Sequence, residues 1–138
     1  MSQDFSHIAV TVPRELLDGT PRQQLLAFYD EVFGWTENPD LTIAGERIFL
    51  RAPTDRQYLT IRASDEPMRT SGYEHLGVAV DSSAELEDLH SRARFWVERD
   101  PRVRLGNVDV AYGGSLHTFR VQFLLPVTIE VQYLADPS

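Results

Sequence analysis

An internal repeat constrains the fold of this chain more than any other feature of its sequence. Residues 5–12 (FSHIAVTV) and 73–80 (YEHLGVAV) share one pattern, in which a histidine follows an aromatic residue by two positions and precedes alternating small and aliphatic residues. The two segments begin nearly half a chain apart. A repeat at this spacing indicates two copies of one supersecondary unit. The alternation of side chains predicts that each copy opens with a β-strand.

A helical pattern follows each of these strands. In the first copy, Thr20-Pro21 suits the start of a helix and Gly34 suits its end. In the second copy, residues 82–85 (SSAE) have the spacing of a capping box, and Asp100-Pro101 ends the pattern. Apolar residues at helical spacing form one stripe in each copy: Leu25, Tyr29, Val32 and Phe33, and then Leu86, Leu89, Ala93, Trp96 and Val97.

Three short β-like runs come after each helix. They lie at about residues 35–43, 46–52 and 56–63, and again at about 102–111, 115–124 and 127–134. The sequence therefore predicts an α+β fold of two tandem βαβββ modules. Module 1 covers about residues 1–63, a linker rich in turn residues covers 64–72, and module 2 covers about 73–138. We expect one domain over residues 1–138, because this length suits a single core.

Composition excludes several classes of function. The chain has no cysteine and its thirteen basic residues are all arginine, so thiol and lysine chemistry are both absent. A net charge of −8 argues against binding to nucleic acid or anionic membranes. We see neither a signal peptide nor a run as apolar as a membrane span. We therefore expect a cytoplasmic protein without a nucleic-acid or membrane partner.

Strand parity divides the side chains between the two faces of each sheet, because successive residues point to opposite sides. If the apolar residues of each strand face its helix, then His7, Tyr58, His75 and Glu130 all face the other way. The same parity applies to further polar residues: Thr60, Arg62, Thr118, Arg120, Gln122, Thr128 and Gln132. One face is thus apolar and the other is polar and ionisable, which is typical of a ligand pocket.

Two histidines and a carboxylate form a ligand set that holds a divalent metal ion and leaves positions open for substrate. His7, His75 and Glu130 are the candidate ligands. A lone strand histidine more often has a structural role, but a buried carboxylate without a partner would be costly. Ligand identity alone does not choose among Fe, Mn, Ni and Zn.

Other polar residues allow structural as well as functional interpretations. His90 fits boundary packing on the second helix, and His117 shares parity with the apolar Phe119. An inward-facing Arg120 needs a partner, which is either Glu130 or another acid of the protein, or an anion of the ligand.

Several segments together resemble the vicinal oxygen chelate superfamily: HIAVTVP, LLAFYDEVFGW, EHLGVAV and TIEVQY. This superfamily includes glyoxalase I, extradiol dioxygenases, fosfomycin-resistance proteins and bleomycin-resistance proteins. The resemblance covers nearly the whole chain and implies a glyoxalase-like fold whose mixed sheets form a curved cup. It implies metal ligands on the first strand of each module and on the last strand, which here are His7, His75 and Glu130. The fourth ligand of glyoxalase I falls at or next to Tyr58, so the set resembles the three-ligand members more.

The resemblance implies a metal-dependent enzyme that binds a small substrate through adjacent oxygens, such as an extradiol-type dioxygenase, isomerase, lyase or transferase. Tyr58 is then the catalytic candidate, and the substrate-binding candidates are Arg120, Thr118, Gln122, Arg62 and Phe49. The alternative is a metal-free protein that sequesters an antibiotic, as bleomycin-resistance proteins do. A third hypothesis is a protein-interaction role for the apolar hairpin at 123–127. We also expect a homodimer, and the sequence leaves open whether one chain or two complete each cup.

Overall fold

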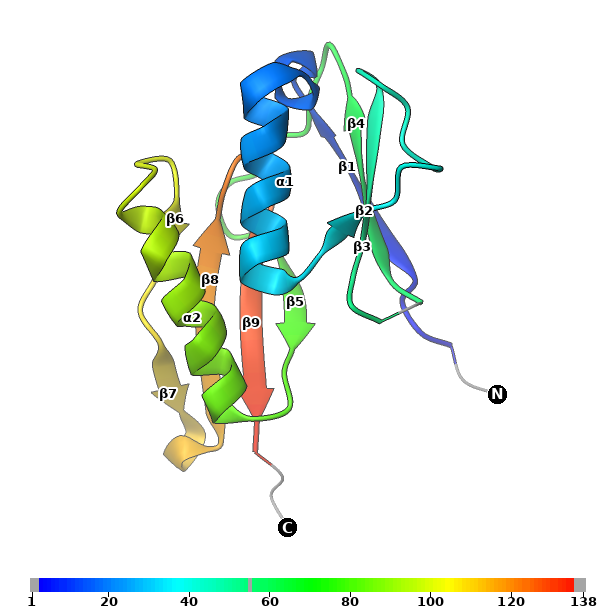
Figure 1. Cartoon of the computed structure of the whole chain (residues 1–138). Coiled ribbons are helices and arrows are strands. Elements are labelled where there is room, and N and C mark those ends of the chain that lie inside the picture. The colour runs from blue at the N-terminus through cyan, green and yellow to red at the C-terminus, as the bar shows by residue number, and fades with distance from the viewer. Residues whose placement is uncertain (1–2, 55, 136–138) are drawn as a thin grey trace. The chain divides into compact units, whose positions relative to one another are not determined.

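The chain divides into two compact units, residues 1–69 and 70–138. The computed structural model describes residues 3–54 and 56–135, and Figure 1 labels their elements. Each unit contains one helix of 15 residues and one mixed sheet, so the predicted α+β class is confirmed. Within the described residues, neither helix has the length and apolar character needed to cross a membrane.

The first unit has the predicted βαβββ order. Its elements are β1 (His7–Val12), the short 3-10 helix η1 (Arg14–Leu17), α1 (Gly19–Phe33), β2 (Thr36–Glu37), β3 (Arg47–Arg51) and β4 (Tyr58–Ala63). The strands lie in the order β1-β4-β3-β2. β1 runs parallel to β4, and the other neighbours are antiparallel. The first strand of the unit, β1, is therefore held in the sheet by its hydrogen bonds to the last strand, β4.

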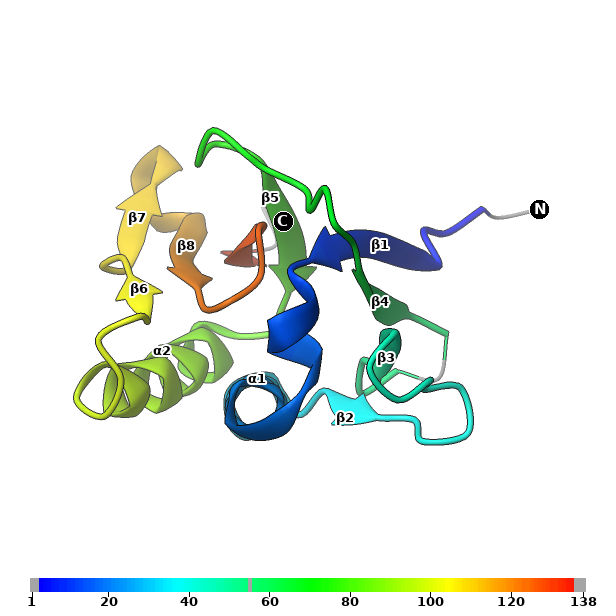
Figure 2. The same cartoon turned by 90° about the horizontal axis from the view of Figure 1, so that it is seen from above.

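The second unit repeats this arrangement with one additional strand. Its elements are β5 (His75–Ala79), α2 (Ser83–Val97), β6 (Arg104–Leu105), β7 (Asp109–Ala111), the 3-10 helix η2 (Tyr112–Gly114), β8 (Leu116–Gln122) and β9 (Thr128–Leu134). The sheet order is β5-β9-β8-β6, and β7 also pairs with β8. The single run predicted at 102–111 is thus two short strands separated by residues 106–108. Figure 2 shows α2 along one side of this sheet, where it contacts β6, β8 and β9.

The helix ends follow local hydrogen-bonding chemistry. Ser82 caps α2 as predicted, because its Oγ accepts a hydrogen bond from Glu85 N at 3.1 Å. The predicted start of α1 at Thr20 is wrong, since Asp18 is the capping residue and its carboxylate accepts from Gly19 N at 2.9 Å. Gly34 ends α1 with a φ of 74°, a conformation that glycine adopts at low cost.

Burial alternates along the strands in the predicted sense. Val12 is buried on β1, whereas His7 on the same strand is exposed. On β9, Ile129 and Val131 are fully buried and Glu130 between them is half-buried. The polar side chains of interest therefore lie on the face opposite the buried one.

Asp100 closes α2 through an ion pair with Arg102. Its carboxylate accepts hydrogen bonds from the Arg102 backbone N at 3.0 Å, from Nε at 3.0 Å and from Nη2 at 2.7 Å. Its own N–H donates to Trp96 O at 2.9 Å. The bonds from Arg102 hold the pKa of Asp100 below its ordinary value, although burial acts in the opposite direction. The same bonds raise the pKa of Arg102.

We predict that Asp100→Asn lowers the free energy of unfolding at neutral pH by about 1–3 kcal/mol, because a charge-assisted hydrogen-bonded pair is lost. A carboxyl group with a lowered folded-state pKa stabilises the fold above its unfolded pKa, and this contribution disappears as the pH falls through the folded value. The gap between wild type and variant should therefore narrow in acid. Urea unfolding at neutral and acidic pH measures this difference in the free energy of unfolding. A difference that does not change with pH would contradict a stabilising role for the charged Asp100 carboxylate.

Candidate functional site

The second unit brings two of the predicted metal ligands together. β5 and β9 run parallel, with Gly77 in register with Glu130 and His75 in register with Thr128. His75 Nε2 lies 3.6 Å from Glu130 Oε2. The two side chains are 25% and 18% exposed, respectively, so water reaches them only in part.

The backbone carbonyl of Tyr73 determines which nitrogen of His75 carries a proton. His75 Nδ1 lies 2.7 Å from Tyr73 O. A carbonyl oxygen can only accept, so Nδ1 is the donor. In a neutral ring, Nε2 then bears a lone pair on the side of the Glu130 carboxylate. Two acceptor atoms that face each other at this separation could both bind one metal ion.

Arg120 shares the carboxylate of Glu130. The two residues are in register on β8 and β9, and Arg120 Nε donates to Glu130 Oε2 at 2.8 Å. This is the same oxygen that faces His75. The guanidinium carbon of Arg120 also lies 5.9 Å from the centre of the Tyr73 ring. Of the partners that the sequence allows for Arg120, the structure shows Glu130.

The first unit places His7 in a stack of rings. The His7 and Tyr58 rings are 4.6 Å apart with an interplanar angle of 2°, and the Tyr58 and Phe49 rings are 4.3 Å apart. His7 Nδ1 is hydrogen-bonded to Ser6 Oγ at 2.8 Å. The stack therefore brings together three candidate site residues: the predicted ligand His7, the catalytic candidate Tyr58 and the substrate-binding candidate Phe49.

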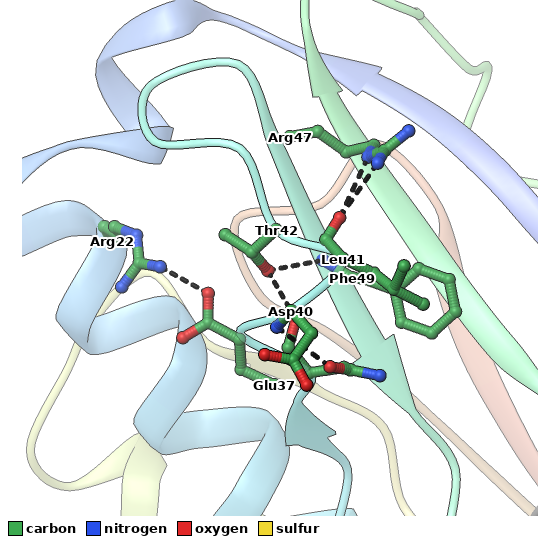
Figure 3. Close-up of polar contacts among 8 residues, drawn as sticks. Arg22, Glu37, Asp40, Leu41, Thr42, Arg47 and Phe49 are labelled. Carbon is green, nitrogen blue, oxygen red and sulfur yellow. Dashed lines mark hydrogen bonds and ion pairs between the residues drawn. The ribbon is translucent and has the colours of Figure 1, made fainter.

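The loop between β2 and β3 supports Phe49 through its own polar contacts (Figure 3). Thr42 Oγ1 donates to Asn38 O at 3.0 Å and accepts from Phe49 N at 3.3 Å. Arg47 donates to the Leu41 carbonyl from Nε and Nη2, at 3.2 and 2.9 Å. These bonds join both arms of the loop to β3, so the backbone that carries the Phe49 ring is held in place.

The remaining substrate-binding candidates differ in their surroundings. Gln122 Nε2 donates to Leu125 O at 3.0 Å, so its amide secures the hairpin that follows β8. Thr118 is half-buried and in register with Gln132 on β9. Arg62 is exposed on β4 in the first unit. The structure places only Arg120 of this group in contact with a predicted metal ligand.

Two further histidines have structural partners. His90 Nε2 donates to Gly106 O at 2.9 Å, and its ring meets the edge of Phe119 at 5.0 Å. His117 Nε2 donates to Gly114 O at 3.0 Å. These contacts match the structural interpretation of both residues.

The apolar hairpin at 123–127 is not an exposed surface. Phe123, Leu125 and Val127 are all buried. The Phe123 ring lies 5.7 Å from that of Trp96 on α2. The hypothesis that this hairpin is an interaction surface is therefore wrong, because its larger apolar side chains belong to the core.

The third predicted ligand, His7, belongs to the first unit, whereas His75 and Glu130 belong to the second. Over residues 3–54 and 56–135, no group of three His, Asp or Glu side chains has the arrangement of a metal site.

Sequence reasoning missed two residues near the His75–Glu130 pair. Tyr73 supplies the carbonyl that orients His75, and its ring meets the imidazole edge-on at 5.6 Å. A signal was present, because an aromatic residue precedes the histidine by two positions in both copies of the repeat. Arg104 lines a hollow together with Arg120. Nothing in the sequence indicated that β6 would bring it there.

The topology of the two units defines the class, because the chain has a glyoxalase-like fold. The FosX fosfomycin resistance protein of Listeria monocytogenes, solved as a variant with Mn(II) and 1S,2S-dihydroxypropylphosphonic acid, is 17% identical, with a TM-score of 0.67 over 95% of this chain and 90% of that chain. FosX from Mesorhizobium loti is 13% identical, with a TM-score of 0.65 over 96% and 93% of the two chains. A possible glyoxalase from Bacillus cereus is 20% identical, with a TM-score of 0.64 over 94% and 98%.

At these identities the likeness shows the fold alone. No protein-family model and no curated protein matches the sequence.

Proposed function

We propose that this protein is a divalent-metal-dependent enzyme that acts on a small substrate bound through adjacent oxygens, with His7, His75 and Glu130 as metal ligands. The arrangement of His75 carries the proposal. Its Nδ1 donates to a backbone carbonyl and its Nε2 faces Glu130 Oε2 at 3.6 Å. Metal-binding histidines commonly donate their second ring N–H in this way. Metal–ligand bonds of about 2.0–2.3 Å place neighbouring donor atoms about 3–4 Å apart, which this pair fits.

His7 is the proposed third ligand because it occupies the repeat-equivalent position. Each of the two histidines opens a strand that runs parallel to the last strand of its own unit. We propose a homodimer, in which His7 of the same chain or of the second copy completes the ligand set. Mn(II) is the first ion to test, because FosX of Listeria monocytogenes was solved with it.

A bound divalent ion would supply Lewis acidity that stabilises negative charge on substrate oxygens. Side chains of this protein would supply hydrogen bonds and bind the substrate. Tyr58, held in the ring stack with His7 and Phe49, provides a phenol hydroxyl as a hydrogen-bond donor or acid. Arg120 provides a guanidinium next to Glu130 for substrate binding.

A metal-free binding protein is the second candidate, and one observation favours it. Arg120 already pairs with the Glu130 carboxylate at 2.8 Å, so this charge has a partner without any metal. In that case the polar face would sequester a small molecule rather than transform it.

Mn(II) binding separates the two candidates. We expect wild-type protein purified without chelator to bind Mn(II), and Glu130→Gln to weaken binding by at least about tenfold, because a ligand loses its charge. The variant should remain folded, since the flanking Ile129 and Val131 stay buried. Calorimetry gives the affinity and circular dichroism checks the fold.

Glu87→Gln on α2 is the matched control, because Glu87 is an exposed carboxylate of the same unit. It should bind Mn(II) like wild type. Equal affinity in wild type and Glu130→Gln, or no uptake by wild type, would overturn the enzyme proposal in favour of the metal-free one.

A further inference from the structure

A hollow of about 310 Å³ opens beside Arg120 in the second unit. The residues that line it include Gly72, Arg104, Gly106, Arg120, Gln122 and Thr128. Two of its lining residues are arginines and none is acidic, although the whole chain carries a net charge of −8. Arg120 is paired with the Glu130 carboxylate, so its charge is partly balanced, and Arg104 brings a further positive charge to the hollow, which suits an anionic group.

The strands explain why this hollow forms. Arg104 on β6 is in register with Gln122 on β8. Two residues further along the chain from Arg104, Gly106 N donates to Arg120 O at 2.9 Å. Gly106 has no side chain, so nothing projects from the chain beside Arg120 at this position. Among the residues that the structure describes, Arg104 forms no ion pair, and its charge is available to a ligand.

Arg120 and a metal ion would compete for one oxygen. Both Arg120 Nε and His75 Nε2 face Glu130 Oε2, at 2.8 and 3.6 Å. A dication bound at Oε2 would stand within a few ångströms of the guanidinium, where the two positive charges repel each other. The ion pair with Arg120 and a metal bond to Oε2 therefore oppose each other.

From this competition we infer that metal binding at Glu130 releases Arg120 into the hollow, where Arg120 and Arg104 together bind an oxyanion of the substrate. The inference rests on the proposed function and adds the substrate class, which is a small molecule with an anionic group in addition to its metal-binding oxygens. A guanidinium recognises such groups through paired N–H donors in one plane. The buried Thr128 places a hydroxyl at the same hollow. Metal and anion then bind with positive coupling. The metal ion frees the Arg120 guanidinium for the anion, and the anion draws the guanidinium away from the Glu130 carboxylate that binds the metal ion.

Sulfate binding with and without Mn(II) tests this inference. We expect saturating Mn(II) to lower the sulfate Kd of wild type by at least about fivefold, and sulfate to lower the Mn(II) Kd by the same factor, since coupling is reciprocal. Acetate in a parallel titration tells whether the subsite takes tetrahedral oxyanions, carboxylates or both. Calorimetry supplies the affinities, and the NMR signals of the arginine Nε–H groups report release of Arg120.

Variants separate the roles of the residues. Arg120→Met should bind Mn(II) at least as tightly as wild type and lose the coupling to sulfate, whereas Arg104→Met should keep its Mn(II) affinity and bind sulfate several-fold more weakly. Arg92→Met on α2 is the matched control, because Arg92 pairs with Asp88 on the same helix. It should behave as wild type.

Glu130→Gln without any metal keeps the test independent of the proposed function. This change removes the carboxylate that holds Arg120, so the variant should bind sulfate more tightly than metal-free wild type. If wild type takes up no Mn(II) while Glu130→Gln gains sulfate affinity, the enzyme proposal fails and the role of Arg120 stands. If sulfate affinity responds neither to Mn(II) nor to Glu130→Gln, or if Arg120→Met keeps the coupling, the inference is overturned.

Discussion

His75→Ala is expected to lower Mn(II) affinity by at least about 100-fold, because it removes a proposed metal ligand. The ring of His75 has a defined orientation, since its Nδ1 donates to the Tyr73 carbonyl at 2.7 Å and its Nε2 faces Glu130. Alanine removes this donor and leaves the hydrogen bond from Arg120 to Glu130 in place. Electron paramagnetic resonance of unbound Mn(II) measures the loss.

His90→Ala is the control for this experiment. His90 also donates to a backbone carbonyl, but its ring contacts Phe119 beside α2 rather than the polar face of the sheet. Its replacement should leave Mn(II) affinity within about twofold of wild type. Retention of Mn(II) by His75→Ala would show that the metal binds elsewhere.

Phe28→Ala is expected to lower the free energy of unfolding by about 3–5 kcal/mol. Phe28 is fully buried on α1, and its ring meets Tyr29 edge-on at 4.9 Å and Phe33 at 6.5 Å. Tyr29 in turn stacks on Trp35 at 5.6 Å. Alanine leaves a cavity beside this cluster of rings, and the helix cannot fill it without moving as a whole. Urea unfolding measures the change.

Phe95→Ala is the matched control on the other helix. The Phe95 ring is 60% exposed and lies under the guanidinium of Arg99. Its loss should cost less than about 1 kcal/mol, because little buried surface is removed. Equal destabilisation by the two substitutions would show that the aromatic cluster around Phe28 is not a stabilising core.

The repeat and the strand parity were predictable because both depend on local sequence. Alternation along β9 correctly assigned Ile129 and Val131 to the buried face and Glu130 to the other. The stripe on α1 was incomplete, since Phe28 lies three positions after Leu25 and belongs to the same helical face. The predicted cap at Thr20 failed for a different reason. The helix begins one residue before Thr20, at Gly19, and the carboxylate of Asp18 caps it by accepting from Gly19 N.

The site was less predictable, because strand parity tells which face of a sheet a side chain lies on but not which side chain lies next to it. Glu130 meets His75 only because β9 lies next to β5, and no pattern in the residues predicted that adjacency. The resemblance implied ligands on these strands without giving their pairing. The contact of Arg120 with Glu130 follows from the register between β8 and β9, which side-chain patterns leave undetermined. The position of Arg104 was harder still to predict, because its strand β6 has only two residues and so shows no alternation of side chains.

The parallel pairing of first and last strands also bears on how a newly made chain acquires its chemistry. β5 leaves the ribosome before its partner β9, which follows only after α2 and three further strands. Contacts between such distant segments form late in folding, after the intervening chain has collapsed. A nascent or truncated chain would therefore carry His75 without Glu130 beside it. The proposed metal site would therefore be incomplete until β9 has been translated and has paired with β5.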